Sequence, residues 1–136
     1  MKNNSLRIVI DANVIISSLV FGGKPEKFIK TIIAEKINVY TSPQLVSEIL
    51  DVLRKKFHFS EEKIEKLERD ILEISRIVYP VKKILAVRDI ADNKVLEAAV
   101  EGKCSVIVTG DKDLLSLKKY KNIQILTASE FLDLML

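Results

Sequence analysis

The chain has 136 residues, of which 48% are hydrophobic and 30% are charged, and its formal net charge is +3. This balance excludes a disordered chain and fits one globular domain, which we expect to span residues 1–136. The sequence has no run of about 18 apolar residues, which argues against a membrane span, and its single cysteine excludes an internal disulfide and fits the reducing cytoplasm.

Short apolar runs and helical patterns alternate in the first part of the chain. Residues 6–10 are apolar and rich in β-branched side chains, which predicts a buried strand. Helices are expected over residues 12–22 and 25–36, because two glycines separate them and Pro25 suits a first helical turn. Residues 37–41 predict a second strand.

Two helices and a short strand are expected in the middle of the chain. Ser42, followed by a proline, predicts the start of a helix that runs to about Lys56. A second helix follows Ser60, which fits a loose capping box, and its apolar residues recur at helical spacing as far as Val78. Residues 77–81 also have the character of a short strand.

A strong strand between helices marks the last third of the chain. The polar residues 89–93 precede a helix that Gly102 ends. Residues 106–108 predict a strand followed by a short helix, residues 123–126 predict another strand, and a helix is expected from Ser129. The alternation along the whole chain predicts an α/β fold, a three-layer α/β/α sandwich around a mostly parallel sheet.

Four acidic residues follow predicted strands or lie in predicted helices. Asp11 and Asp111 follow strands directly or within a few residues. Asp92 opens a helix, and Glu48 lies in the helix after the second strand. Because α/β sheets place their sites beyond the carboxyl ends of the strands, we expect these side chains to converge on one cleft.

Clustered carboxylates indicate a metal site. Mg²⁺ and Mn²⁺ prefer such oxygen ligands and can promote hydrolysis of a phosphodiester, whereas carboxylates without a cation repel one another. Each acid also has a structural interpretation. Asp11 and Asp92 are placed to cap helices. Asp111 or Asp113 is placed to cap a short helix, and Glu48 alone would suit a solvated helix surface.

Four segments together resemble the PIN domain family, and they look most like its VapC-like toxins from toxin–antitoxin systems. The matching segments are IVIDANVIISSLV (8–20), TSPQLVSEILDVL (41–53), RDIADNKVLEAAVEGKCSVIVTGDKDLL (88–115) and IQILTASEFL (123–132). Their order and spacing match over nearly the whole chain. The resemblance implies a Rossmann-like, PIN-like fold and a Mg²⁺- or Mn²⁺-dependent endoribonuclease.

The resemblance also implies roles for individual residues. The matched catalytic and metal-binding acids are Asp11, Glu48, Asp92 and Asp111. Asp113 is a further candidate metal ligand, and Asn13 matches a polar position that could orient the first acid through its amide.

The chain departs from the family pattern at two places. A dense acidic run is usual before the third acid, but residues 89–93 read Asp-Ile-Ala-Asp-Asn here, and a position that is commonly Thr is Ala12. Two alternatives therefore stay open. One is a catalytically degraded scaffold that binds RNA or protein, and the other is an RNA-processing nuclease that is not a toxin.

Basic residues suggest where RNA would bind. The candidates for contact with the RNA backbone are Arg54, Lys55, Lys56 and Lys112, although solvated surface is the simpler interpretation of such clusters. Single-stranded or looped RNA is the expected target, because side chains do not easily read an A-form duplex. The resemblance further implies a homodimer and, for toxins, a cognate antitoxin protein.

Two other functions fit parts of the sequence. Asp11 after a strand could act as a phosphoryl nucleophile, although that chemistry commonly uses a second acid where this chain has Asn13. A structural subunit could present the helix at 64–78 to a partner. Cys104 lies in an apolar run and is expected to be a buried small hydrophobe, and His58 is expected to lie at the surface or to pack.

Overall fold

The computed structural model describes residues 6–135, in which short strands alternate with helices. The strands are β1 (Arg7–Ile10), β2 (Asn38–Thr41), β3 (Ser75–Ile77), β4 (Val106–Val108), β5 (Lys119–Tyr120) and β6 (Ile123–Leu126). The helices are α1 (Ala12–Val20), α2 (Gly23–Ala34), α3 (Pro43–Lys55), α4 (Glu61–Ile74), α5 (Ile90–Glu101), α6 (Lys112–Leu117) and α7 (Ala128–Met135).

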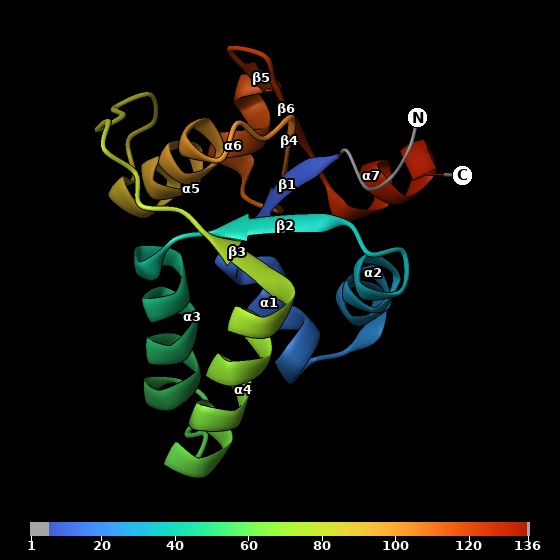
Figure 1. Cartoon of the computed structure of the whole chain (residues 1–136), viewed down its shortest axis with the longest axis vertical. Helices are drawn as coiled ribbons and strands as arrows, with labels where there is room; N and C mark the ends of the chain where they lie inside the picture. Colours follow the sequence, from blue (N-terminus) through green and yellow to red (C-terminus); the bar gives the residue numbers. More distant parts are fainter. Residues whose placement is uncertain (1–5, 136) are drawn as a thin grey trace.

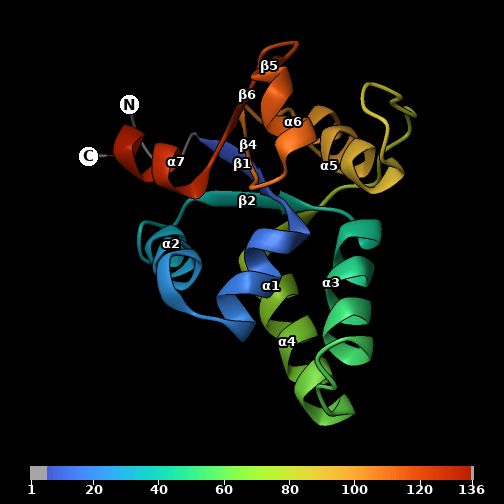
Figure 2. The same ribbon diagram turned by 180° about the vertical axis from the view of Figure 1, so that it is seen from behind.

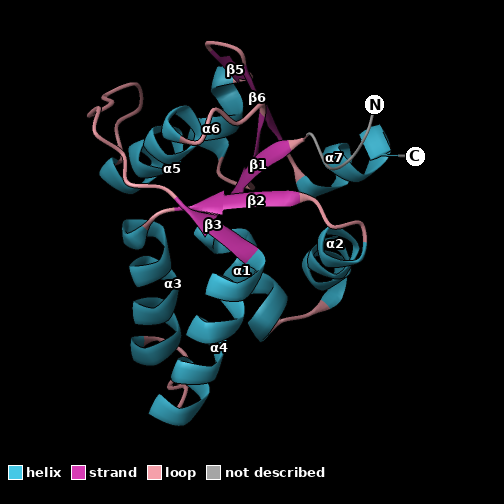
Figure 3. Cartoon of the chain, viewed as in Figure 1, coloured by secondary structure: helices cyan, strands magenta, loops and turns pink. Residues whose placement is uncertain are grey.

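The strands form one six-stranded sheet in the order β3-β2-β1-β4-β6-β5, and helices cover both of its faces (Figures 1 and 3). All the strand pairs are parallel except the β5–β6 pair. The predicted α/β architecture with a mostly parallel sheet is therefore confirmed.

Alternate residues of β1 divide the core between the two faces of the sheet. Val9 belongs to the cluster under α5 and α6, whereas Ile8 and Ile10 pack with α1, α2 and α7. A third cluster joins α1 to α3 and α4. Because both faces of the central strands are buried, their sequences are continuous apolar runs instead of alternating ones.

The strand order reverses between β1 and β4, and this reversal positions the site. The chain continues from β1 to β2 on one side, whereas β4 lies on the other side of β1. The helices that follow the two strands pack on opposite faces, since Val14 of α1 and Leu114 of α6 belong to different core clusters. A crevice beyond the carboxyl ends of β1 and β4 is the usual place for a ligand in such sheets.

Two predicted helix starts are confirmed by side-chain caps. The Ser42 hydroxyl accepts a hydrogen bond from the Leu45 N–H at 3.3 Å. The Ser60 hydroxyl accepts one from the Lys63 N–H at 3.2 Å. Each cap satisfies a backbone donor that would otherwise have no partner in the first helical turn.

The predicted boundary between the fourth helix and the next strand is wrong. The helix ends at Ile74 instead of continuing to Val78, and the strand is Ser75–Ile77 instead of 77–81. The reason is pairing with β2: the Val78 N–H donates to the Thr41 carbonyl oxygen at 2.8 Å. Sheet formation thus overrides a helical spacing that continues past the end of the helix.

The structure contains one strand that the sequence analysis did not predict. The two-residue strand β5 pairs antiparallel with β6 at the sheet's edge.

None of the helices within residues 6–135 combines the length and the apolar composition needed to cross a membrane.

Candidate metal centre and active site

Asp11 is fixed at the carboxyl end of β1 by two hydrogen bonds. The Thr109 hydroxyl donates to Asp11 Oδ2 at 2.7 Å, and the Asn13 N–H donates to Oδ1 at 3.3 Å. The second bond caps α1, so the capping interpretation is confirmed. The carboxyl is only 3% exposed, and this burial raises its pKa while the Thr109 hydrogen bond opposes the rise.

Three other aspartates form a compact cluster beside Asp11. Asp92 lies in the first turn of α5, and Asp111 and Asp113 lie at the start of α6. Each offers one carboxylate oxygen, and these oxygens lie within 4.8 Å of one another. The structure therefore joins Asp113, the further candidate from the sequence, to two of the four matched acids.

Asp92 is the most perturbed member of this cluster. It is 7% exposed, and its Oδ2 is buried with no hydrogen-bond partner among the residues that the structure describes. Burial raises the pKa of Asp92 from its ordinary 3.8 to about 7, and the nearby charge of Asp111 adds to the rise. A buried carboxylate oxygen without a partner is costly unless something binds it.

The donors in the cluster fit a hard divalent cation. All three side chains supply carboxylate oxygens, which suit Mg²⁺ or Mn²⁺ better than softer metals. A cation held by Asp92, Asp111 and Asp113 would give Asp92 Oδ2 the partner it lacks and would offset the repulsion among the three charges.

Glu48 lies near the cluster but outside it. It is half-buried on α3, and burial is the main cause of its raised pKa, followed by the charges of Asp11 and Asp89. Those charges place it within electrostatic range of the other acids. Its carboxylate is not part of the group whose oxygens lie within 4.8 Å of one another.

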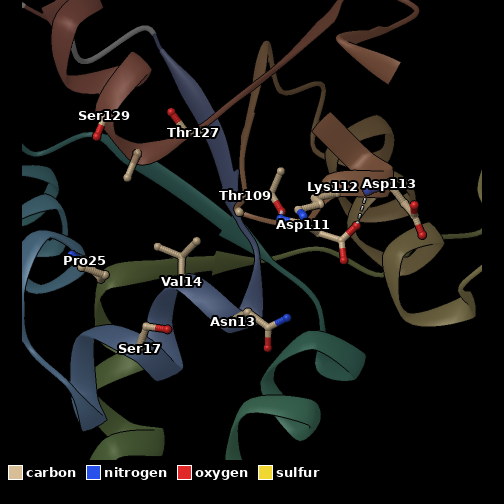
Figure 4. Close-up of a pocket in the computed structure, with 12 residues that line it drawn as sticks. Asn13, Val14, Ser17, Pro25, Thr109, Asp111, Lys112, Asp113, Thr127 and Ser129 are labelled. Atoms are coloured by element: carbon tan, nitrogen blue, oxygen red, sulfur yellow. Dashed lines mark hydrogen bonds between the residues drawn. The ribbon is translucent and has the colours of Figure 1, made fainter. Parts of the chain in front are cut away.

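The helix caps in the site differ partly from the sequence interpretation. Asp89, and not Asp92, caps α5 by accepting from the Ala91 N–H at 2.8 Å. Asp111 caps α6 by accepting from the Asp113 and Leu114 N–H groups at 2.9 and 3.1 Å (Figure 4). Because Asp89 caps the helix, the buried Asp92 carboxylate is available to bind a ligand.

Sequence reasoning missed Asn93, which fastens the loop before α5. The Ala86 and Val87 N–H groups both donate to Asn93 Oδ1 at 3.0 Å. Its Nδ2 donates to the carbonyl oxygens of Val87 and Asp89 at 2.7 and 3.2 Å. The sequence offered little signal for this role, because Asn93 is one of several polar residues in α5 and only its burial shows that it needs partners.

Glu97 and Glu101 fasten the same loop farther along α5. The Ile84 N–H donates to the buried Glu97 carboxylate at 2.9 Å, and Lys94 forms an ion pair with it at 3.1 Å. The Val81 N–H donates to the exposed Glu101 at 3.2 Å. With Asn93, these residues recur every four positions, so one face of α5 supports the loop while Asp92 lies in the cluster.

We expect Asn93→Ala to lower the free energy of unfolding by about 2–4 kcal/mol, because it leaves two loop N–H groups and two carbonyls without their partner. Urea denaturation followed by circular dichroism measures this. Glu101→Ala is the matched control and should cost less than about 1 kcal/mol, since its single bond is exposed. Equal losses in the two variants would contradict the central role given to Asn93.

The basic candidates lie in different surroundings. Arg54 is already paired, with Asp51 at 3.2 Å and Glu61 at 2.7 Å. It lies with Lys55 near the end of α3 that points away from the sheet (Figures 1 and 2). Lys112, in contrast, is exposed beside the acid cluster.

Cys104 lies in the core, whereas His58 lies at the surface. Cys104 is buried, and burial raises the pKa of its thiol to about 12, which suits a packed small hydrophobe. Phe57 and Phe59, which flank the exposed His58, pack against the cluster between α3 and α4.

One family model and one curated relative match most of the chain. The family model described as PIN domain matches residues 7–113. The chain is similar to the uncharacterised protein MJ1680 of Methanocaldococcus jannaschii, with 36% identity over 146 residues that cover 98% of this chain and 94% of that protein.

Solved structures share the fold at low identity. The toxin VapC20 of Mycobacterium tuberculosis, described as cleaving the sarcin–ricin loop, superimposes with a TM-score of 0.60 at 14% identity, covering 86% of this chain and 98% of that one. FitAcB of Neisseria gonorrhoeae gives a TM-score of 0.63 at 17% identity, covering 90% and 98%.

Proposed function

The chain belongs to the PIN domain family, and on that premise we propose that it is a Mg²⁺- or Mn²⁺-dependent endoribonuclease, the toxin of a toxin–antitoxin pair. One observation carries the proposal: the buried, unpartnered Asp92 Oδ2 lies in a group of three carboxylates. A fold that needed these acids only for structure would pair that oxygen, because leaving it unsatisfied is costly.

In the proposed mechanism, Asp92, Asp111 and Asp113 would hold the cation. When bound there, a divalent cation polarises a phosphate oxygen and lowers the pKa of a water molecule. Hydrogen bonds from the Thr109 hydroxyl and the Asn13 N–H hold the buried Asp11 carboxylate in place, within electrostatic range of Asp92. We assign proton transfer from the attacking water to Glu48, because its pKa is raised and it lies within electrostatic range of Asp11. Hydrolysis breaks the bond from phosphorus to the 3′ oxygen, leaving a 5′-phosphate and a 3′-hydroxyl.

The proposal extends to partners. Single-stranded or looped RNA is the substrate, and Lys112 is the basic candidate that lies beside the cluster. The family resemblance supports a cognate antitoxin and a homodimer in the cytoplasm.

Cleavage of a pool of single-stranded RNA tests the proposal. We expect cleavage in Mg²⁺ or Mn²⁺, none in EDTA, and a loss of at least about 100-fold in Asp11→Asn, because the neutral amide cannot replace the carboxylate. The fold should survive that change, since it also removes a buried charge. Cleavage that persists in EDTA or in Asp11→Asn would rule out this mechanism.

No cleavage combined with no Mn²⁺-induced rise in melting temperature would favour the degraded scaffold instead. A cation that binds only the folded state must raise the melting temperature. This second measurement therefore separates a site that binds the cation without cleaving RNA from a chain that has no cation site.

A further inference from the structure

Five exposed cations lie around the C-terminal end of α5. They come from the start of β1, from β3, from the loop before α5 and from the turn before β4, and they are Arg7, Arg76, Lys82, Lys83 and Lys103. None of the five forms an ion pair within residues 6–135. Four segments of the chain thus bring unpaired positive charge to one end of a helix.

Two arginines lie on the face of the sheet that α5 covers. Arg7 Nη1 donates to the Gly102 carbonyl oxygen at 3.2 Å, at the point where α5 ends, and Lys103 follows directly. The Arg7 guanidinium lies 5.4 Å from the centre of the Tyr40 ring, which packs in the core under α5. Arg76 is the register partner of Tyr40 in the neighbouring strand, so its side chain points to the same face.

The loop between β3 and α5, which lies beside α5 in Figure 1, adds two lysines. Its Val81 N–H donates to Oε1 of Glu101, the last residue of α5, at 3.2 Å. Ile84 is buried in the core under the same helix. Lys82 and Lys83 lie between these two attachments and are exposed, so the loop is held against α5 while their ammonium groups stay in solvent.

The usual role of a cation at a helix end explains only part of this charge. The negative end of a helix dipole is worth roughly half a charge, and Arg7 already donates to the Gly102 carbonyl there. Glu101 adds one negative charge. Together the helix end and Glu101 balance fewer than two of the five cations, so most of the positive charge is left for a ligand.

This basic surface is separate from the acid cluster. Asp92 lies in the first turn of α5 and Glu101 is its last residue, so the helix separates them by about 14 Å at ~1.5 Å per residue. The cation that lines the groove beside Asp111 is Lys112, and the one that lines the groove beside Glu48 is Lys94. The five cations line neither groove.

We propose that the five cations form a second binding surface for RNA, which holds phosphates at a distance from the cleaved bond. The inference rests on the proposed ribonuclease function and deepens it. The carboxylates of the acid cluster repel a phosphate backbone, and Lys112 is the one cation that lines the groove there. Contacts between cations and phosphates supply most of the sequence-independent affinity of proteins for nucleic acids. RNA is favoured over an acidic protein segment, because the proposed substrate already brings a continuous row of phosphates to the neighbouring cleft.

Salt-dependent binding of a long RNA tests the proposal. The full chain carrying Asp11→Asn, which prevents cleavage, is titrated in Mn²⁺ with a fluorescent single-stranded RNA of about 20 nucleotides, longer than one small site covers. Lys82→Ala with Lys83→Ala should weaken binding about 10–25-fold at about 0.1 M salt, because two phosphate contacts are lost. The slope of log affinity against log salt should become shallower by about 1.4.

Cleavage by the chain with an intact Asp11 provides a second readout. For the long RNA, the double lysine variant should raise KM about 10–25-fold and leave kcat within about twofold, since the surface acts on binding alone. An RNA of about 4 nucleotides cannot reach both ends of α5, so its kcat/KM should also stay within about twofold. An equal loss with the short RNA would show that the lysines act through the acid cluster, and it would overturn the proposal.

The matched control is Lys27→Ala with Lys30→Ala, which removes the same charge. Both lysines are exposed on α2, which packs on the other face of the sheet. The control should weaken binding of the long RNA less than about threefold. Equal losses in the two double variants would show that RNA responds to net charge alone, which contradicts a localised surface. Thermal melts should show that both variants are folded.

The remaining outcomes are also decisive. No binding of the long RNA by the parent chain, or unchanged binding in the double lysine variant, overturns the proposal. Polyglutamate that binds more tightly than RNA and depends on Lys82 and Lys83 would assign the surface to an acidic protein segment instead. Cleavage is scored separately, so the nuclease function can stand when the basic surface fails. Binding that depends on the two lysines in a chain that cleaves no RNA would uphold the surface and reject the nuclease function.

Discussion

Asp92→Asn should stabilise the metal-free protein and at the same time abolish RNA cleavage. At pH 8 the buried Asp92 carboxylate carries a charge that faces Asp111 and lacks a hydrogen bond on Oδ2. An amide of nearly the same shape removes the repulsion and supplies N–H donors that carboxylates can accept. We expect a gain of about 2–4 kcal/mol in the free energy of unfolding.

Cleavage should fall at least about 100-fold in the same variant, because one anionic ligand of the cation is lost. Differential scanning calorimetry in EDTA and RNA cleavage in Mn²⁺ give the two measurements. A gain of 2–4 kcal/mol corresponds to a melting temperature higher by roughly 6–20 °C for a chain of this size.

The matched control is Asp133→Asn, which neutralises an exposed aspartate on α7. It should leave both the melting temperature and the cleavage rate nearly unchanged. A fall in the stability of metal-free Asp92→Asn would show that the carboxylate is paired in the folded protein, and the argument for a cation would then lose its main observation.

The metal-free protein should lose stability as the pH rises from about 4 to about 7. The folded protein holds the Asp92 proton more tightly than the unfolded chain, because the pKa is raised from 3.8 to about 7. Unfolding therefore releases a proton over this range, and raising the pH favours unfolding. Asp11 and Glu48, whose pKa values are also raised, contribute in the same direction.

Urea denaturation in EDTA at a series of pH values measures this slope. Saturating Mn²⁺ should reverse the trend above about pH 6, since the cation binds the ionised carboxylates and only the folded state assembles them. Asp92→Asn is the control and should reduce the slope of the metal-free curve to the part that Asp11 and Glu48 contribute. A metal-free protein that becomes more stable between pH 4 and pH 7 would contradict the assignment of a strained acid cluster.

Local sequence patterns predicted most elements because their causes are local. A serine before Pro43 and one before Glu61 cap the helices that follow, and each cap involves residues three apart. Buried parallel strands appear as short apolar runs. The predicted end of the fourth helix was wrong for the opposite reason. Pairing with the distant strand β2 ends this helix at Ile74.

The positions of the acids followed from the sequence, but their grouping did not. Alternating strands and helices place Asp11 and Asp111 beyond strand ends in any parallel α/β sheet. Which oxygens approach one another depends on how α5 and α6 pack. That packing brings Asp113 into the cluster and leaves Glu48 outside it.

The sequence by itself determined the fold class, the family and the set of candidate acids, because periodicity, caps and motifs are properties of neighbouring residues. Only the tertiary structure decided that Thr109 holds Asp11 across 98 positions of sequence. It also decided that Asn93 fastens the loop before α5 and that Asp92 Oδ2 is buried without a partner. Burial and contact between distant segments exist only after the chain has packed, and they produce the electrostatic strain that a cation would relieve.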